Sequence, residues 1–390
     1  MFSWITNCCT PDLRKHPSSG SSRRRRIGIR STGSDDALLI ASGSSVTSSG
    51  KPTPPEPLFK EQVRVLSYNI FMRPNNPIRG STEYQDIRAD LFIEHVLPSY
   101  DIVCLQEMFT LPLSSRRHEF LKRAQQNGFF WSHASSRSHS FSPSIDGGLV
   151  ILSRYPILRR DTMHFSSAAF ADWYASKGVI YTLIQVGPRD PHFLHVFCTH
   201  LQATYDETGR EVSERVRREQ VEQIVSFINK CVFNRDEWPI LICGDLNVQC
   251  RKSGEDGSDS DEYIQMMNML REGLGLRGEL VRDLAKEIDG RTHPVTYGDA
   301  HFDNEGNVKL KEVSLTDVTT LTQSRQWCNQ SLDKVFYIPA VENLGKIEPQ
   351  STIINPIYVS EREWDVPKTA PLTHLSDHYA VESVLRVDLE

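Results

Sequence analysis

Polar side chains that could do chemistry stand at the ends of apolar runs in this sequence. Two amides, three carboxylates and two imidazoles occupy such positions: Asn69, Asn247, Glu107, Asp245, Asp377, His200 and His378. Carboxylate and amide oxygens are ligands that suit Mg²⁺, and imidazoles can move protons near neutral pH. No reactive Ser or Cys elbow accompanies them. The pattern indicates a magnesium site with proton-transfer groups.

Each of these positions alone has a structural explanation. An Asp or Asn at a strand end is more often a turn former than a catalyst, and a single His more often belongs to a core or a surface. Five apolar segments are bounded in the same way, however, and loops at strand ends are where sheet proteins assemble their sites. The repetition favours one shared site.

The hydrophobic pattern predicts the elements that would position these groups. Strands are expected over 63–71, 101–108, 148–153, 178–186, 192–200, 238–243, 332–338 and 378–387, and helices over 85–97, 115–127 and within 211–230. Several strands follow one another without an intervening helix, so the sheets should be mixed. We therefore expect an α/β (α+β) fold in which two mixed β-sheets pack face to face with helices outside.

The charge of the chain is unevenly distributed. The 390 residues have a formal net charge of −6, but residues 1–30 carry seven Lys or Arg against one Asp, which leaves −12 on the remainder. Binding to a phosphate backbone depends on clustered cations. The acidic body therefore predicts no stable nucleic-acid binding.

The first 57 residues differ in composition from the rest. Ser, Gly, Arg and Pro dominate residues 1–57, which predicts a disordered tail. Residues 58–390 are expected to form the catalytic domain. The eight Cys include no Cys-x-x-Cys pair, which indicates reduced thiols and a cytoplasmic location.

Five short segments resemble the motifs of the endonuclease/exonuclease/phosphatase superfamily. They are Leu-Ser-Tyr-Asn-Ile at 66–70, Cys-Leu-Gln-Glu-Met at 104–108, Thr-His at 199–200, Gly-Asp-Leu-Asn-Val at 244–248 and Ser-Asp-His-Tyr at 376–379. They occur in that family's order, and the resemblance covers roughly residues 62–388. It implies a four-layer α/β/β/α sandwich of the DNase I-like type.

Three further segments resemble neutral, magnesium-dependent sphingomyelinases. They lie at 146–157 (Asp-Gly-Gly-Leu-Val-Ile-Leu-Ser-Arg-Tyr-Pro-Ile), at 175–179 (Ala-Ser-Lys-Gly-Val) and at 199–203 (Thr-His-Leu-Gln-Ala). This resemblance implies a Mg²⁺-dependent phosphodiesterase. Its substrate would be sphingomyelin or a related phospholipid at a membrane surface, and its products ceramide and phosphocholine.

The resemblance assigns groups to the metal and the phosphate. Glu107 should bind Mg²⁺, with Asn69 beside it holding the metal or the phosphate and Asp377 reinforcing the metal and water network. Lys177 is a second phosphate contact, with Asp172 as its partner. A solvated loop cation is the alternative for Lys177.

The resemblance also assigns the groups that carry out hydrolysis. His378 is the expected general base, and Asp333 is the acid that orients its imidazole. Asp245 and Asn247 are two residues apart, so they share one side if strand geometry persists, and they would orient the water and the phosphate. His200 should donate a hydrogen bond to a phosphoryl oxygen.

Other functions remain open from the sequence. An inositol polyphosphate phosphatase would need a Trp-Cys-Asp-Arg run, whereas residues 327–330 read Trp-Cys-Asn-Gln. An abasic-site nuclease would be expected to have a more basic body, and a deadenylase is a further possibility. A non-catalytic scaffold is disfavoured because every expected ligand and imidazole is present.

Membrane access is expected to come from the tail. Cys8 and Cys9 stand beside apolar residues, and Arg23 to Arg26 follow. Acylation together with a polybasic run predicts peripheral membrane attachment, and an unmodified tail is the alternative. Tyr358 and Trp364 could contact lipid beside the site or belong to the core.

Overall fold

The computed structural model describes the chain from residue 54 to residue 389. It leaves out 74–83, 111–113, 138–144, 189–191, 206, 233–236, 253–256, 289, 291, 299, 303–307, 311–329, 342–345, 360–363, 365–371 and 373. The unit that carries the predicted site spans Glu56–Glu390. Almost all of the predicted tail lies outside the described residues, so its disorder and its membrane role stay predictions.

The first large sheet contains the first strand and the last strand of this unit. Its members are β1 (Gln62–Asn69), β2 (Ile102–Gln106), β3 (Trp131–Ala134), β5 (Val150–Ser153), β15 (Ile347–Asn355) and β16 (Ala380–Val387). Their order is β15-β16-β1-β2-β5-β3. The β1–β2 pair is parallel and the other pairs are antiparallel, so the sheet is mixed as expected.

The second large sheet comes from the middle of the chain. Its members are β6 (Ile157–His164), β8 (Gly178–Gln185), β9 (Phe193–His200), β10 (Ile240–Asp245), β11 (Arg282–Asp283) and β14 (Asp333–Ile338). Their order is β11-β14-β10-β9-β8-β6. Only β9 and β10 run parallel among these pairs. Two small pairs complete the described strands, β4 (Ile145–Asp146) with β7 (Ala175–Ser176) and β12 (Ala300–Phe302) with β13 (Val308–Leu310).

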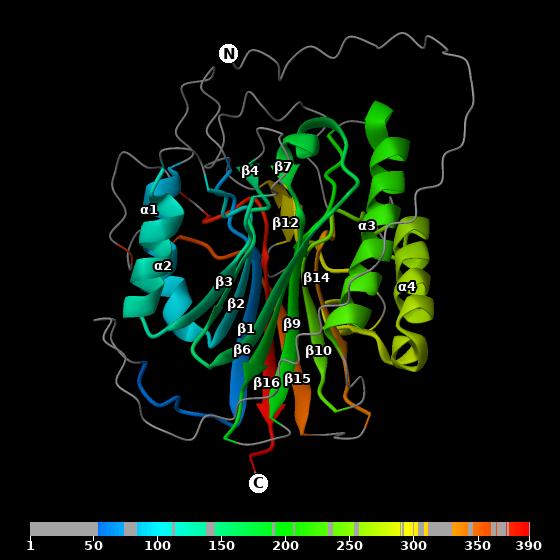
Figure 1. The fold of residues 1–390 in the computed structure, drawn as a ribbon. Coiled ribbons are helices and arrows are strands. Elements are labelled where there is room, and N and C mark those ends of the chain that lie inside the picture. The colour runs from blue at the N-terminus through cyan, green and yellow to red at the C-terminus, as the bar shows by residue number, and fades with distance from the viewer. Residues whose placement is uncertain are drawn as a thin grey trace, which may run out of the picture. The chain divides into compact units, whose positions relative to one another are not determined.

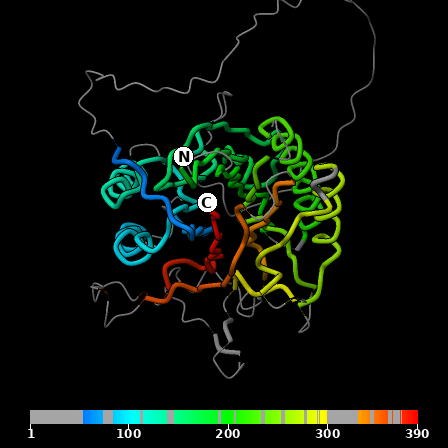
Figure 2. Tube along the Cα trace, turned by 90° about the horizontal axis from the view of Figure 1, so that it is seen from below, coloured from blue at the N-terminus to red at the C-terminus, as the bar shows by residue number. Residues whose placement is uncertain are grey.

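Helices cover the outer face of each sheet (Figure 1). On the first sheet lie α1 (Gln85–Leu91), its continuation η1 (Phe92–Val96) and α2 (Arg116–Gln126), and on the second lie α3 (Arg210–Cys231) and α4 (Asp261–Gly273). The end view in Figure 2 shows the two helix pairs on opposite sides of the sheets. The fold is the four-layer α/β/β/α sandwich that the sequence predicts. Among the described helices, none is long and apolar enough to span a bilayer.

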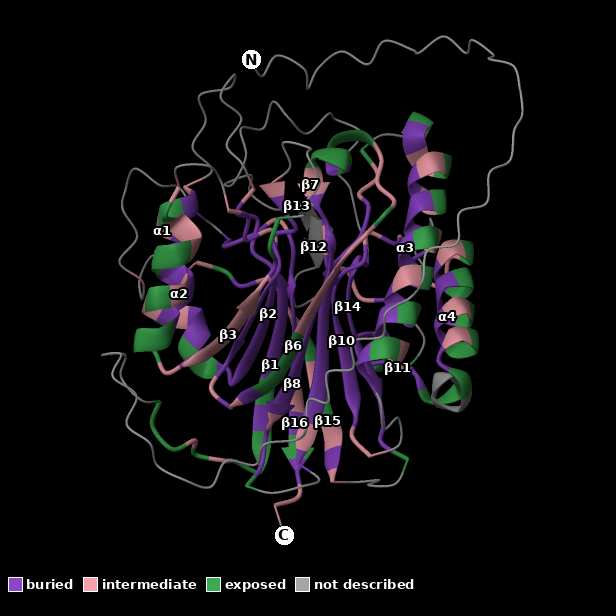
Figure 3. Cartoon of the chain, viewed as in Figure 1, coloured by how far each residue is buried: buried purple, intermediate pink, exposed green. Residues whose placement is uncertain are grey.

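The alternation of side chains along each strand divides the interior into three cores. In β1, Val63 and Val65 pack in the core between the sheets, whereas Leu66 and Tyr68 pack in the core beneath α1 and α2. Successive side chains of a strand point to opposite faces, so one strand serves both cores. The central strands of both sheets are therefore buried through most of their length, whereas edge strands such as β6 are more exposed (Figure 3).

The structure adds elements that the hydrophobic pattern did not reveal. One of them is α4, which begins after Ser260, whose side chain accepts a hydrogen bond from Tyr263 N at 3.1 Å. Such a cap satisfies a free amide of the first helical turn. The strands β6 and β15 were also missed, because they lie at sheet edges and carry few buried side chains.

Candidate active site

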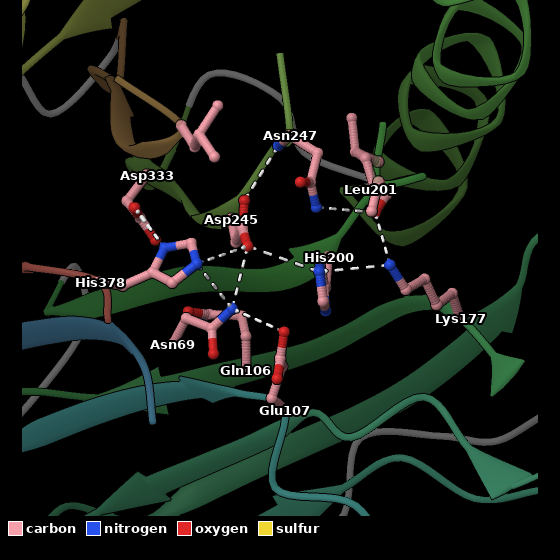
Figure 4. A network of polar contacts seen from close by, with 12 residues as sticks. Asn69, Gln106, Glu107, Lys177, His200, Leu201, Asp245, Asn247, Asp333 and His378 are labelled. Carbon is pink, nitrogen blue, oxygen red and sulfur yellow. Dashed lines mark hydrogen bonds and ion pairs between the residues drawn. The ribbon is translucent and has the colours of Figure 1, made fainter. Parts of the chain in front are cut away.

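Strand alternation brings polar groups of both sheets to one end of the space between them. At the ends of β1 and β2, Asn69 and Gln106 are in phase with residues of the inter-sheet core. In the second sheet, Asp245 is in register with His200 on one side and with Asp333 on the other. Figure 4 shows these side chains converging from the two sheets.

His378 and Asp333 form a buried pair. His378 Nδ1 lies 2.9 Å from Asp333 Oδ2. Although burial disfavours the imidazolium, the carboxylates of Asp333 and Asp245 raise the pKa of His378 to about 10. Burial raises the pKa of Asp333 to about 6, which leaves its carboxylate ionised at neutral pH. Asp333 therefore keeps a proton on Nδ1 and turns Nε2 toward the site.

Asp245 lies at the centre of the network in Figure 4. Its Oδ2 accepts a hydrogen bond from Asn69 Nδ2 at 2.9 Å and lies 3.4 Å from His200 Nε2 and 3.7 Å from His378 Nε2. Although burial opposes its charge, the nearby His378 holds the pKa of Asp245 below its usual value. Asp245 is therefore an anionic carboxylate that can orient a polar ligand between the imidazoles of His200 and His378.

Glu107 follows β2 in a left-handed backbone conformation, with φ of 62°. This conformation is rare for residues other than Gly and clusters at functional sites. Its Oε1 accepts a hydrogen bond from Asn69 Nδ2 at 3.1 Å. Burial, and then the charge of Asp377, raise the pKa of Glu107 to about 7. The carboxylate is thus partly desolvated, and the positive charges of His378 and Arg73 offset this effect only in part.

A divalent cation fits this group of residues. One oxygen or nitrogen atom from each of Glu107, His200 and Asp245 lies within 4.8 Å of the other two. Carboxylates that crowd one another are stabilised by a hard cation, which reverses the effect of burial on their pKa values. The charge of Asp377 reaches Glu107 and His378, which agrees with its predicted place in the same network.

His200 and Lys177 form the other side of the site. Lys177 is 4% exposed, and its Nζ donates to Asp172 Oδ2 at 2.9 Å, to Leu201 O at 2.8 Å and to His200 Nε2 at 3.2 Å. It is therefore not a solvated loop cation. Burial and the Lys177 charge lower the pKa of His200 to about 3. His200 is neutral, and its Nδ1 has no hydrogen-bond partner among the described residues.

Asn247 reaches the site by a different route from the one expected. The strand ends at Asp245, and Asn247 adopts φ of 50°, so strand alternation does not extend to it. Its backbone N–H donates to Asp245 Oδ1 at 3.0 Å, and its Nδ2 donates to Leu201 O at 3.1 Å. Asn247 therefore orients Asp245 through the main chain in this structure.

Several supporting residues escaped the sequence analysis. The Thr296 hydroxyl accepts the backbone N–H groups of Leu332 and Asp333 at 2.9 and 3.0 Å, and the Tyr297 ring lies 4.7 Å from the His378 ring. The Ser376 hydroxyl donates to Asn69 O at 2.6 Å. Ser376 was within a recognised motif and could have been named. Residues 296 and 297 carry no comparable signal, because their partners are distant in the sequence.

Comparisons with known proteins agree with this geometry. Residues 66–300 match the Endonuclease/Exonuclease/phosphatase family. A sphingomyelinase of Dictyostelium discoideum is 30% identical over 366 residues, which cover 81% of this chain and 78% of that protein. Sphingomyelinase C of Bacillus cereus is 32% identical over 222 residues, 54% of this chain and 63% of that protein.

Solved structures agree on the fold. A beta toxin of Staphylococcus aureus, solved with bound magnesium ions, matches 83% of this chain and 99% of its own with a TM-score of 0.57 at 21% identity. At that identity the likeness concerns the fold alone. Together with the sequence matches and the convergence of the family's motif residues on one site, it shows that the chain belongs to the endonuclease/exonuclease/phosphatase family.

Proposed function

We propose that this protein is a Mg²⁺-dependent phosphodiesterase that hydrolyses sphingomyelin to ceramide and phosphocholine. One observation carries the proposal: the buried His378–Asp333 pair faces Asp245 and Asn69, which in turn contact His200 and Glu107. A general base, an anionic carboxylate that orients the water and a carboxylate that binds the metal are the groups that phosphoester hydrolysis by water requires. The sphingomyelinase names of its relatives support the choice of substrate.

Glu107 would hold the metal, together with Asp377 and the amide of Asn69. When bound, the ion would neutralise phosphoryl oxygens as a Lewis acid and offset the negative charge around His378. Both N–H groups of Asn69 donate in this structure, one to Glu107 and one to Asp245, so Asn69 holds these two carboxylates in place. The fit rests on the donor set and on the raised pKa of Glu107, whose charge nearby positive groups offset only in part.

His378 takes the proton of the attacking water through Nε2. A base must be neutral before it acts, whereas Asp333 and Asp245 favour the imidazolium of the metal-free protein. Asp333 holds Nδ1–H in place and stabilises the imidazolium that forms during the reaction. Asp245 accepts a hydrogen bond from the water, so that a lone pair of the water oxygen points to phosphorus.

His200 and Lys177 act on the charge that develops on the phosphate. Because Lys177 only donates, the neutral His200 accepts at Nε2 and carries its proton on Nδ1. A fixed N–H donor in a buried site stabilises a growing negative charge without reorganisation. Asp172 holds Lys177 in place.

A substrate panel tests the proposal. Purified full-length protein is assayed on sphingomyelin, phosphatidylcholine, an inositol polyphosphate and an abasic-site DNA, each with Mg²⁺ and with excess chelator. We expect release of phosphocholine from sphingomyelin with Mg²⁺ only, and none from the His378→Ala variant. Preference for the inositol phosphate or DNA would replace the substrate, and full activity in chelator would refute the metal role.

The tail carries the proposed membrane attachment. Each Arg of the 23–26 run contributes about 1 kcal/mol near an anionic surface, and acylation of Cys8 and Cys9 adds about 0.8 kcal/mol per buried methylene. These contributions would hold the acidic catalytic unit at a cytoplasmic membrane surface. Fractionation of cell extracts, with the cysteines replaced, tests this part separately.

A further inference from the structure

Exposed aromatic side chains gather beside the candidate site. Among the described residues, five large aromatic side chains are exposed, and four of them lie in η3 (Phe170–Tyr174) or in the loop after β9. They are Phe170, Trp173, Tyr174 and Tyr205, with 43%, 57%, 54% and 40% exposure. We call these four residues the aromatic rim. The η3 segment next to β7 is visibly exposed in Figure 3.

The rings of the aromatic rim contact one another in pairs. Phe170 and Tyr205 lie edge to face with ring centroids 6.5 Å apart, and Trp173 and Tyr174 do so at 5.2 Å. Phe170 has φ of 54°, a conformation that a bulky residue rarely adopts. A left-handed backbone that leaves a large aromatic ring 43% exposed suggests use at an interface.

The η3 part of the aromatic rim carries no exposed charge. Between residues 165 and 176 the only charged side chain is Asp172, which is 5% exposed. Its carboxylate accepts hydrogen bonds from Lys177 Nζ, Ala203 N and Tyr205 OH. An uncharged stretch rich in Trp, Tyr and Phe is unusual in a chain of which 24% is charged.

The rim is continuous with the phosphate side of the candidate site. Asp172 binds the rim through Tyr205 and the site through Lys177, and Lys177 reaches His200. A surface that docks on the rim is therefore brought beside His200. By contrast, Trp364 stacks on His95 at 4.5 Å and packs against the core beneath α1, which is the core alternative that the sequence left open for it.

We infer that the aromatic rim inserts into the headgroup region of an electrically neutral phospholipid bilayer and orients the site toward it. The inference rests on the proposed function, because a lipid substrate requires this face to approach a bilayer. Amphipathic Trp and Tyr rings favour the membrane–water interface. Because the η3 part of the rim carries no exposed charge, we expect its binding to depend little on anionic lipid or on salt.

A vesicle-binding experiment tests the inference. The full-length chain, made without acylation and with His378→Ala to prevent turnover, is sedimented with phosphatidylcholine vesicles in 0.1 and 0.5 M salt. We expect Trp173→Ser/Tyr174→Ser to weaken binding at least tenfold at both salt concentrations. The matched control Leu158→Ser/Ile353→Ser removes two equally exposed apolar side chains elsewhere and should bind as the parent does. Unchanged binding of the rim variant would overturn the inference.

Activity on two forms of substrate separates the inference from the proposed function. With His378 intact, the rim variant should hydrolyse sphingomyelin vesicles at least about tenfold more slowly, yet cleave a water-soluble choline phosphodiester as the parent does. Equal loss on both substrates would mean that the rim supports the site and not membrane docking. If the parent cleaves neither substrate but loses vesicle binding on rim substitution, the proposed function fails and the inference stands.

Discussion

Glu107→Gln should stabilise the metal-free protein at alkaline pH while removing its activity. The environment raises the pKa of Glu107 from 4.5 to about 7. A carboxyl group whose folded pKa is raised contributes stability below its unfolded pKa and loses it as pH rises through the folded pKa. The wild-type protein therefore loses stability between about pH 4.5 and 7 because of this group, and the variant does not.

The magnitude follows from the shift. A change of 2.5 pKa units corresponds to at most about 3 kcal/mol. Because Glu107 is only partly buried by surface area, solvent screening reduces this, and we expect about 1–3 kcal/mol. Gln keeps an oxygen that can accept the hydrogen bond from Asn69, so shape and that contact are retained.

Urea unfolding in chelator, at pH 5 and pH 8, measures the effect. The quantity of interest is the variant's free energy of unfolding minus that of the wild type, because all other titrating groups cancel. This difference in the free energy of unfolding should be more positive at pH 8 than at pH 5 by about 1–3 kcal/mol. Excess Mg²⁺ at pH 8 should stabilise the wild type and leave the variant nearly unchanged. A difference that does not vary with pH would refute the raised pKa of Glu107.

Three further predictions concern the site and the tail. Asp333→Asn should lower kcat less than His378→Ala does, and should shift the acidic limb of the pH–rate profile downward, because the imidazolium loses its partner; an unchanged limb would contradict the pairing. Gly244→Ala should lower both the melting temperature and the activity, because the added Cβ would clash with the carbonyl oxygen of Thr199 beside Asp245. Wild-type values for both would show that β9 and β10 can move apart to accommodate the methyl group. Cys8→Ser/Cys9→Ser should move the protein from the membrane to the soluble fraction of cell extracts without changing its activity in detergent micelles, and an unchanged membrane fraction would exclude an acyl anchor.

Much of the fold could be predicted because strand signals are local. In β1 and β10, apolar runs end in Asn69 and Asp245, and alternation along each strand already places these side chains on the face of the inter-sheet core. The order of these strands predicted two mixed sheets packed face to face, and the resemblance to the family's motifs implied the four-layer arrangement. The polar edge strands β6 and β15 gave no such signal, because their exposure depends on their place in the sheet.

The sequence by itself determined the types of group in the site and their position at strand ends. Only the tertiary structure decided their partners. Pairing of β10 with β9 and β14 sets His200 and Asp333 beside Asp245, and packing of the sheets adds Glu107 from the other side. Hydrogen bonds, burial and pKa values depend on these distances between segments far apart in the chain, which no local pattern encodes. The aromatic rim illustrates the same limit, since exposure becomes known only when the surrounding chain has folded.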